Sequence, residues 1–161
     1  ADMALYEGKL RGKAKSMRYQ KDFDPNRRNR LGFALSDITQ HLPGAFLIYK
    51  ADPENDQILF ANQELVTYAG CKNLDEFMQY SKHSFRNLIR SDEQEAVEKS
   101  IWQQIQSQAA GTNDFVQFHF VKKDGSTHPV LDHGRIVESN YYGNVFYVLI
   151  MDCQLLDEHY D

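Results

Sequence analysis

Residues 115–152 read FVQFHFVKKDGSTHPVLDHGRIVESNYYGNVFYVLIMD, and this stretch decides the fold. It holds three runs rich in β-branched and aromatic residues, at 115–121, 127–138 and 144–151. Lys-Asp-Gly-Ser at 123–126 separates the first two runs, and Asn-Tyr-Tyr-Gly at 140–143 separates the last two. Both separators are typical of turns, so the stretch predicts three consecutive antiparallel strands.

A predicted β-hairpin lies upstream. The apolar runs AFLIY at 45–49 and QILFA at 57–61 flank a turn-like sequence at 52–56. With helices between the hairpin and the three final strands, the element order is typical of an α+β fold. We therefore expect a five-stranded antiparallel sheet with helices on one face, preceded by an N-terminal helical extension.

Capping residues predict where these helices begin. Asn62 is expected to cap a short helix that ends before Gly70, and Asn73 to cap another. The sequence Ser-Asp-Glu-Gln at 91–94 predicts a capping box for a longer amphipathic helix that ends before Gly111. The apolar residues of that helix recur every four positions, at Val97, Ile101 and Ile105.

Composition restricts the class of protein. The chain has 161 residues, of which 42% are hydrophobic and 25% charged, as in one ordinary globular domain. Its longest unbroken apolar run is the seven residues 145–151, too short for a membrane span, which needs about 20. Two cysteines, without close metal-ligand spacing, predict neither a disulfide framework nor a zinc site. We expect a cytoplasmic protein with reduced thiols and no bound metal.

Charge divides the chain unevenly. The net charge is -5, and residues 1–30 hold nine basic and four acidic residues, whereas residues 31–161 hold nine basic and nineteen acidic ones. A basic segment of this kind suits a nucleic-acid arm, a membrane tether or part of a neighbouring domain. No aromatic residues alternate with the arginines at 27–30, which argues against single-stranded nucleic acid as a partner.

Residues 1–13 read ADMALYEGKLRGK. The pattern A-D-x-A-L-Y-x-x-K-x-x-G-K resembles the closing helix of GGDEF (diguanylate cyclase) domains. This resemblance implies that residues 1–20 are the C-terminal remnant of such a domain, in which Lys9 and Lys13 stand where the family contacts nucleotide phosphates. The GGDEF loop and its acidic metal ligands are missing from the chain, so we expect no cyclase activity from it.

Residues 21–41 are interpreted as a linker followed by a connector helix. Apolar residues there are spaced by four, three and four positions, as in a coiled-coil seam. The spacing is equally compatible with a dimer interface and with a helix that packs on its own domain. The residues of this predicted seam are Leu31, Leu35, Ile38 and Leu42.

Residues 42–152 resemble a PAS domain. The stretches PGAFLIYKAD, ILFANQELVTYAG, FRNLIRSDEQEAV, FVKKDGS and VFYVLIMDC occur in the order of that family's elements. Asp152 stands where many PAS domains carry an Asp-Ile-Thr signalling junction, and residues 153–161 follow as an exit linker.

The resemblance implies a small-molecule pocket between the sheet and the helices. Its candidate residues are Phe60, Phe77, Phe85, Phe118, His119, Tyr147 and Ile150. Aromatic clusters of this kind, here with Phe120 included, belong to a hydrophobic core more often than to a ligand site, because burial alone explains them. Flavin is disfavoured because residues 84–89 lack a cysteine and Ile150 stands where a glutamine is expected; haem is disfavoured because residues 92–108 lack a histidine. The cofactor is otherwise unknown.

Histidines suggest no further site. Asp132 and His133 with a nearby serine resemble a hydrolytic triad only on paper, because adjacent strand residues point to opposite faces. The expected function is a regulatory PAS sensor of a bacterial cyclic-di-GMP signalling protein, which binds a small ligand, dimerises, or does both to control an adjacent domain. The alternative is a dimerisation scaffold without a ligand.

Overall fold

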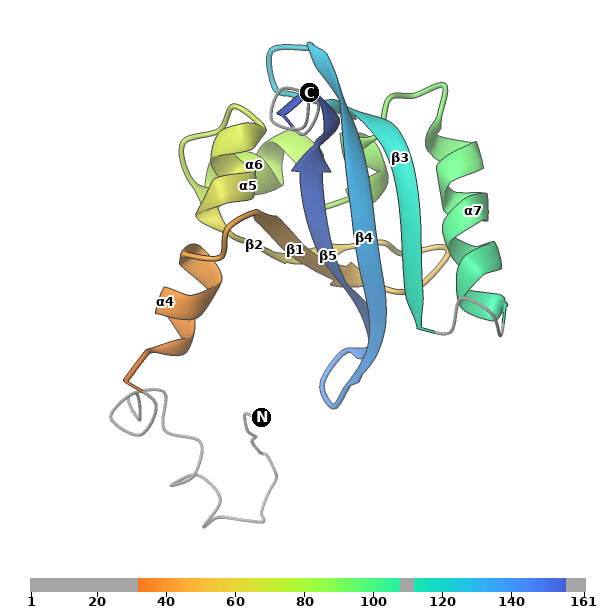
Figure 1. Ribbon diagram of the computed structural model, residues 1–161, viewed down its shortest axis with the longest axis horizontal. Helices are drawn as coiled ribbons and strands as arrows, with labels where there is room; N and C mark the ends of the chain where they lie inside the picture. Colours follow the sequence, from red (N-terminus) through yellow and green to blue (C-terminus); the bar gives the residue numbers. More distant parts are fainter. Residues whose placement is uncertain (1–31, 108–111, 156–161) are drawn as a thin grey trace. The chain divides into compact units, whose positions relative to one another are not determined.

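The computed structural model describes residues 32–107 and 112–155 (Figure 1). These residues fall into two units. Residues 42–138 and 144–155 form the first, which carries the sheet and most of the helices. The second contains residues 32–41 and 139–143, with helix α4 at Leu35–Gln40. No helix of the described residues is both long and apolar enough to cross a membrane.

The first unit is built on a five-stranded antiparallel sheet with strand order β2-β1-β5-β4-β3. The predicted hairpin is formed by β1 and β2, with a register shift between Ile48 and Tyr49. The predicted three-strand segment forms β3, β4 and β5. The strands are β1 Ala45–Lys50, β2 Ile58–Ala61, β3 Asn113–Val121, β4 Thr127–Ser139 and β5 Gly143–Asp152.

Helices connect β2 to β3 and cover one face of the sheet (Figure 1). Helix α5 packs against β1, and α7 packs against β3. The predicted caps are confirmed at Asn62 and Asn73, whose side chains accept hydrogen bonds from Leu65 N and Glu76 N. The elements are α5 Gln63–Tyr68, α6 Leu74–Ser81, the 3-10 helix η1 Phe85–Leu88 and α7 Gln94–Gln106.

The predicted capping box at 91–94 is wrong. Helix α7 begins after Glu93, which makes no side-chain cap hydrogen bond. Its carboxylate is held by β3 instead: the backbone N–H of His119 donates to Oε1 (2.7 Å), and His119 Nδ1 lies 2.9 Å from Oε2. Gln94, the last residue of the predicted box, donates to the carbonyl oxygens of Arg86 and Ile89 instead.

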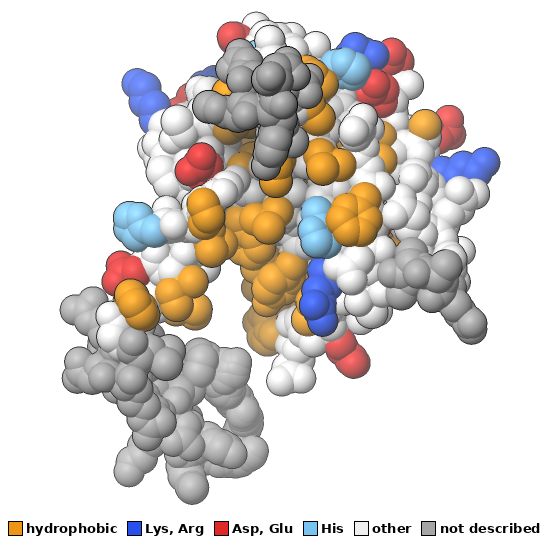
Figure 2. All heavy atoms as spheres, in the orientation of Figure 1, with side chains coloured by type: hydrophobic (Ala, Val, Ile, Leu, Met, Phe, Trp, Pro, Cys, Tyr) orange, Lys and Arg blue, Asp and Glu red, His pale blue; other side chains and the backbone are white. Residues whose placement is uncertain are grey.

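Alternation along the strands separates a buried inner face, which the helices cover, from an outer face. In β1 and β5 the inner face carries Leu47, Tyr49, Phe146 and Val148, all nearly inaccessible to solvent. The outer face is also apolar, and Figure 2 shows hydrophobic side chains gathered over it. Its exposed members on β3 and β5 are Phe115, Tyr147, Leu149 and Met151.

The structure describes part of the predicted seam. Helix α4 contains Leu35 and Ile38, none of its residues is buried, and it ends at Gln40, before Leu42. Leu31, and the GGDEF-like residues Lys9 and Lys13, lie outside the described residues.

Candidate functional site

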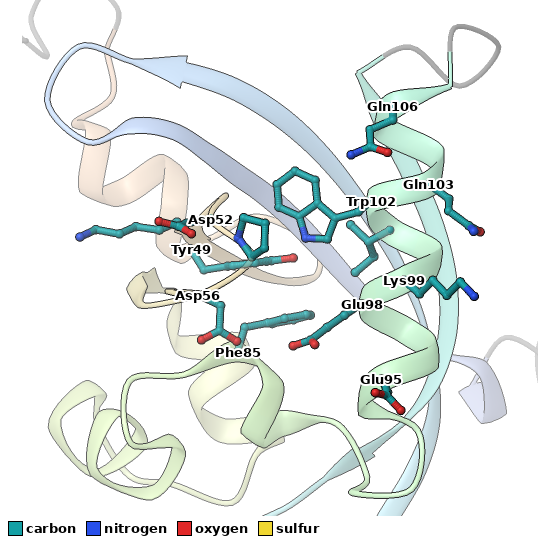
Figure 3. A pocket seen from close by; sticks show the side chains of 13 residues that line it. Tyr49, Asp52, Asp56, Phe85, Glu95, Glu98, Lys99, Trp102, Gln103 and Gln106 are labelled. Carbon is teal, nitrogen blue, oxygen red and sulfur yellow. The ribbon is translucent and has the colours of Figure 1, made fainter.

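A cavity of about 390 Å³ lies between α7 and the segment that joins β1 to β2 (Figure 3). This volume is within the range of small-molecule sites, about 300–1,000 Å³. Helix α7 forms one wall with residues such as Trp102 and Glu98, and the end of β1 and η1 form the other with Tyr49 and Phe85. All these elements belong to the first unit, so the fold of this unit alone builds the cavity.

Aromatic rings make the apolar part of the cavity. The rings of Tyr49 and Phe85 stack with centroids 4.2 Å apart and planes 6° from parallel. Trp102 contacts Phe146 edge to face at 5.6 Å, and Phe146 in turn lies 5.1 Å from Tyr49. Ring faces of this kind attract both apolar groups and cations.

The polar part of the cavity is acidic. Its lining includes the acidic residues Asp52, Asp56, Glu95 and Glu98 and the basic residues Lys50 and Lys99. Figure 3 shows the Glu98 carboxylate pointing into the cavity and the Lys99 side chain pointing away from it. The surplus of carboxylates gives the cavity a negative potential.

Glu98 and Asp56 differ in how they are held. Burial, and to a lesser degree the charges of Asp56 and Glu95, raise the pKa of Glu98, although Arg86 lies 3.5 Å away and acts in the opposite direction. Asp56 accepts hydrogen bonds from Ser84 Oγ (2.7 Å) and Arg86 N (2.9 Å). Asp56 thus stabilises the start of η1 through two hydrogen bonds, whereas Glu98 is held by its longer ion pair with Arg86.

Two further carboxylates lie on the inner face of the sheet, at Asp114 of β3 and Asp132 of β4. Each residue is 1% exposed, and no described residue hydrogen-bonds to any of their four oxygens. Burial raises the pKa of Asp114 to about 6, and burial together with the charge of Asp114 raises the pKa of Asp132 well above its ordinary value. Unpaired buried carboxyl groups are costly, and such groups gather at functional sites.

Neither aspartate of this pair lines the cavity, but both lie close enough to Tyr49, which does, for their charges to act on it. Gln104 of α7 is hydrogen-bonded at 2.9 Å to both the N–H and the carbonyl oxygen of Phe115 on β3, and Trp102 contacts Phe146 on β5. Since β4 runs between β5 and β3, this half of α7 spans the strands that carry both aspartates. Tyr49, which lines the cavity, has a raised pKa caused by burial and then by the charges of Asp132 and Asp114.

Gly134 makes room for this pair, because it lies opposite Asp114 on β4 and a Cβ there would be 2.5 Å from Asp114 Oδ1. We expect Gly134→Ala to lower the free energy of unfolding by about 2 kcal/mol, as overpacking does. Combined with Asp114→Ala, which removes the clashing oxygen, the glycine change should cost at least about 1 kcal/mol less. Urea denaturation of the wild type, the two single variants and the double variant gives the free energies of unfolding for this comparison.

The matched control is Gly44→Ala, whose Cβ would meet only Leu149 at 3.9 Å. It should leave stability within about 1 kcal/mol of the wild type. Equal costs for Gly134→Ala with and without Asp114 would show that the carboxylate does not occupy the space above Gly134.

Comparison with solved structures identifies the architecture. The PAS domain of an HTR-like protein from Haloarcula marismortui matches with a TM-score of 0.58 and 15% identity over 84% of this chain and 99% of that one. A PAS domain from Colwellia psychrerythraea matches with a TM-score of 0.55 and 11% identity; the alignment covers 79% of this chain and 98% of that one. The fold is that of the PAS domains.

A LOV protein from Rhodobacter sphaeroides also matches, with a TM-score of 0.55 and 14% identity; the alignment covers 71% of this chain and 62% of that one. At such identities the likeness concerns the fold alone. No protein-family model and no curated protein matches the sequence.

Within the PAS fold, the seven predicted pocket residues do not line a single cavity. Phe85 lines the described one, and Phe77, Phe118 and Ile150 belong to the buried core. Strand alternation places Phe60, His119 and Tyr147 on the other side of the sheet: Phe60 and Tyr147 contact Phe46, and His119 pairs with Glu93.

The expected separation of Asp132 and His133 is confirmed. Asp132 is buried on the inner face, and His133 is exposed on the outer face, where its ring stacks on Phe115 at 4.3 Å. The two side chains therefore cannot work together as members of a triad. Among the described residues, no group of three or more His, Cys, Asp and Glu side chains could hold a metal ion.

The end of β5 is tied to α5. The hydroxyl of Tyr68 donates to Asp152 Oδ2 at 2.6 Å, and Asp152 Oδ1 accepts from the backbone N–H groups of Gln154 and Leu155. Burial acts to raise the pKa of Asp152, but these hydrogen bonds hold it below its ordinary value. The aspartate of the PAS-like junction therefore joins the helical layer to the chain's exit from the sheet.

Proposed function

We propose that this chain is a regulatory sensor module that binds a small molecule and signals to neighbouring domains. The observation that carries the proposal is the cavity beneath α7, which aromatic rings and Glu98 line, with the unpartnered pair Asp114 and Asp132 buried within electrostatic reach of Tyr49 in its wall. A core that served stability alone would replace such carboxyl groups with apolar side chains.

The proposal extends to the organisation of the chain. Residues 42–152 form the PAS module, residues 21–41 a linker and connector helix, and residues 153–161 an exit linker. The GGDEF-like pattern in residues 1–20 supports a parent that is a cytoplasmic bacterial protein of cyclic-di-GMP signalling, with catalysis in its adjacent domains. A ligand that shifts α5 or α7 would reach the exit through the contact between Tyr68 and Asp152.

Native mass spectrometry of the chain, purified without denaturation, tests the sensor. We expect a species heavier than the apoprotein by one small molecule, or such a species after incubation with a metabolite mixture followed by desalting. If the chain retains no small molecule from either source, the sensor function is contradicted. An absorption spectrum of the same sample tests the expectation that neither flavin nor haem is bound.

A second candidate function is a dimerisation scaffold without a ligand, which the outer face favours. Tyr147, Leu149 and Met151 are 44%, 42% and 47% exposed on one strand, a contiguous apolar surface of the kind that mediates protein contacts. The same mass spectrum separates the candidates. A dimer that never holds a small molecule supports the scaffold, and a monomer contradicts it.

A further inference from the structure

We infer that the ligand of this cavity is a small organic cation, an amine or a guanidine, whose N–H groups are bound by Asp114 and Asp132. The inference rests on the proposed sensor function and adds to it the chemical class of the ligand. Three features carry it: the unsatisfied pair, the acidic lining and the aromatic wall.

The pair requires a positive partner or shared protons. Two carboxylates on neighbouring strands, each 1% exposed, repel each other and have lost their hydration. No described residue donates a hydrogen bond to their oxygens, and the nearby titratable groups do not compensate their negative charge. Tyr49 adds no positive charge, Glu98 and Asp56 are acidic, and Arg86 is paired with Glu98. His128, on the same face of β4, lies 3.9 Å from Asp152 instead.

The surroundings favour a cation from outside the chain. The cavity lining holds more acidic than basic side chains, so a cation is attracted and an anion is repelled. The rings of Tyr49, Phe85 and Trp102 offer faces and edges to the apolar part of such a ligand, and ring faces bind ammonium and guanidinium groups. Asp114 and Asp132 are not among the residues that line the cavity, so the inference requires Trp102, the partly exposed member of this wall, to move and admit the ligand to the pair.

An organic cation fits better than a calcium ion. Calcium takes six to eight oxygen ligands, whereas the described residues contain no cluster of three potential metal-ligating side chains. An ammonium or guanidinium group carries several N–H donors, and each carboxylate oxygen accepts one or two of them. The cavity of about 390 Å³ suits a ligand of amino-acid to polyamine size.

Isothermal titration calorimetry with a matched series tests the ligand class. The probes are primary amines and guanidines with chains of about three to eight carbons, among them 1,5-diaminopentane, which is compared with 1,5-pentanediol and glutarate. We expect at least one cation of the panel to bind, and to bind at least tenfold more tightly than the diol or dicarboxylate of the same length.

Substitution locates the site. Asp132→Asn and Asp114→Asn should each weaken binding of that cation at least tenfold, because a charge-assisted hydrogen bond becomes a neutral one. Asp75→Asn, at an exposed position in the first turn of α6, should leave binding unchanged. Unchanged affinity in both pair variants would overturn the inference.

The pH dependence of cation binding to the wild type is an independent test, which does not require the variants to fold. Because the pair binds protons more tightly than ordinary carboxyl groups, a cation must displace them. Affinity should therefore rise at least tenfold from pH 5 to pH 8, and the observed heat at pH 5 should depend on the ionisation enthalpy of the buffer. A pH-independent affinity would overturn the inference.

Failure of the inference and failure of the sensor function are distinguishable. If native mass spectrometry finds a neutral or anionic ligand, or if no amine or guanidine binds while another class does, the ligand class is wrong and the sensor remains. If no small molecule of any charge binds, the sensor function itself fails.

Discussion

Replacing Asn62 with alanine is expected to lower the free energy of unfolding by about 3 kcal/mol. Asn62 is fully buried, and its Oδ1 accepts hydrogen bonds from Leu65 N (3.1 Å) and Phe46 N (3.0 Å), while Nδ2 donates to Gly44 O (3.0 Å). The side chain therefore joins the start of α5 to β1. Its loss leaves these backbone groups without partners, at about 1 kcal/mol or more for each.

Asn73→Ala is the matched control. Asn73 also caps a helix, α6, but it is exposed and accepts a single hydrogen bond, from Glu76 N at 2.8 Å. Its removal should cost about 1 kcal/mol, the usual value for an N-cap. Urea denaturation of both variants gives the comparison, and equal losses would show that the bonds of Asn62 to Phe46 and Gly44 do not contribute.

The contrast between these asparagines shows how far sequence reasoning reaches. Both caps are predictable, because an asparagine before an amphipathic run is a local signal. The bonds of Asn62 to Phe46 and Gly44 join residues 16 and 18 positions apart, and no local pattern indicates them. The capping box at 91–94 is the opposite case: the local pattern predicts it, but the helix begins after Glu93, whose carboxylate contacts His119, 26 positions away.

The strands are predictable, since alternating apolar runs and turn residues mark each one. Which face of each strand points to the helices is not, because both faces of this sheet are apolar. Tyr147 and Ile150 therefore look equivalent in the sequence, yet Tyr147 is 44% exposed and Ile150 is 4% exposed.

For the same reason, the sequence does not indicate that Asp114 and Asp132 are buried. Asp132 alternates with Val130, and the neighbouring Leu131 alternates with His133, so the sequence marks no inner face on β4. Gly134 is the one available signal, because a glycine inside a strand often marks the close approach of another group. That group, the carboxylate of Asp114, becomes evident only from the pairing of β3 with β4.

The stability of the ligand-free domain should therefore fall as pH rises above about 5. Carboxyl groups of the unfolded chain titrate near pH 4, whereas the pKa of Asp114 in the folded state is about 6 and that of Asp132 is also raised. The folded state thus keeps protons that the unfolded chain releases. The stabilisation is complete below about pH 4, and Asp114 alone loses about 2 to 3 kcal/mol of it by pH 7.

Carboxylates with lowered pKa values act in the opposite direction, but their contribution is complete by about pH 5. They are Glu76, Asp92, Glu93, Asp124 and Asp152. Thermal unfolding of the ligand-free wild type should therefore show its highest midpoint near pH 5 and a decline of several degrees by pH 7.5.

The variant Asp114→Asn/Asp132→Asn isolates the share of the pair in that decline. Its midpoint should change much less between pH 5 and 7.5, since its amides do not titrate, whereas the exposed control Asp75→Asn should keep the slope of the wild type. Saturation with a cationic ligand should also make the wild-type midpoint less dependent on pH, because the positive charge of the ligand compensates the carboxylates when they lose their protons. If the double variant and the wild type decline in parallel, the buried carboxyl groups are not the groups that hold those protons, and the cation is not bound through them.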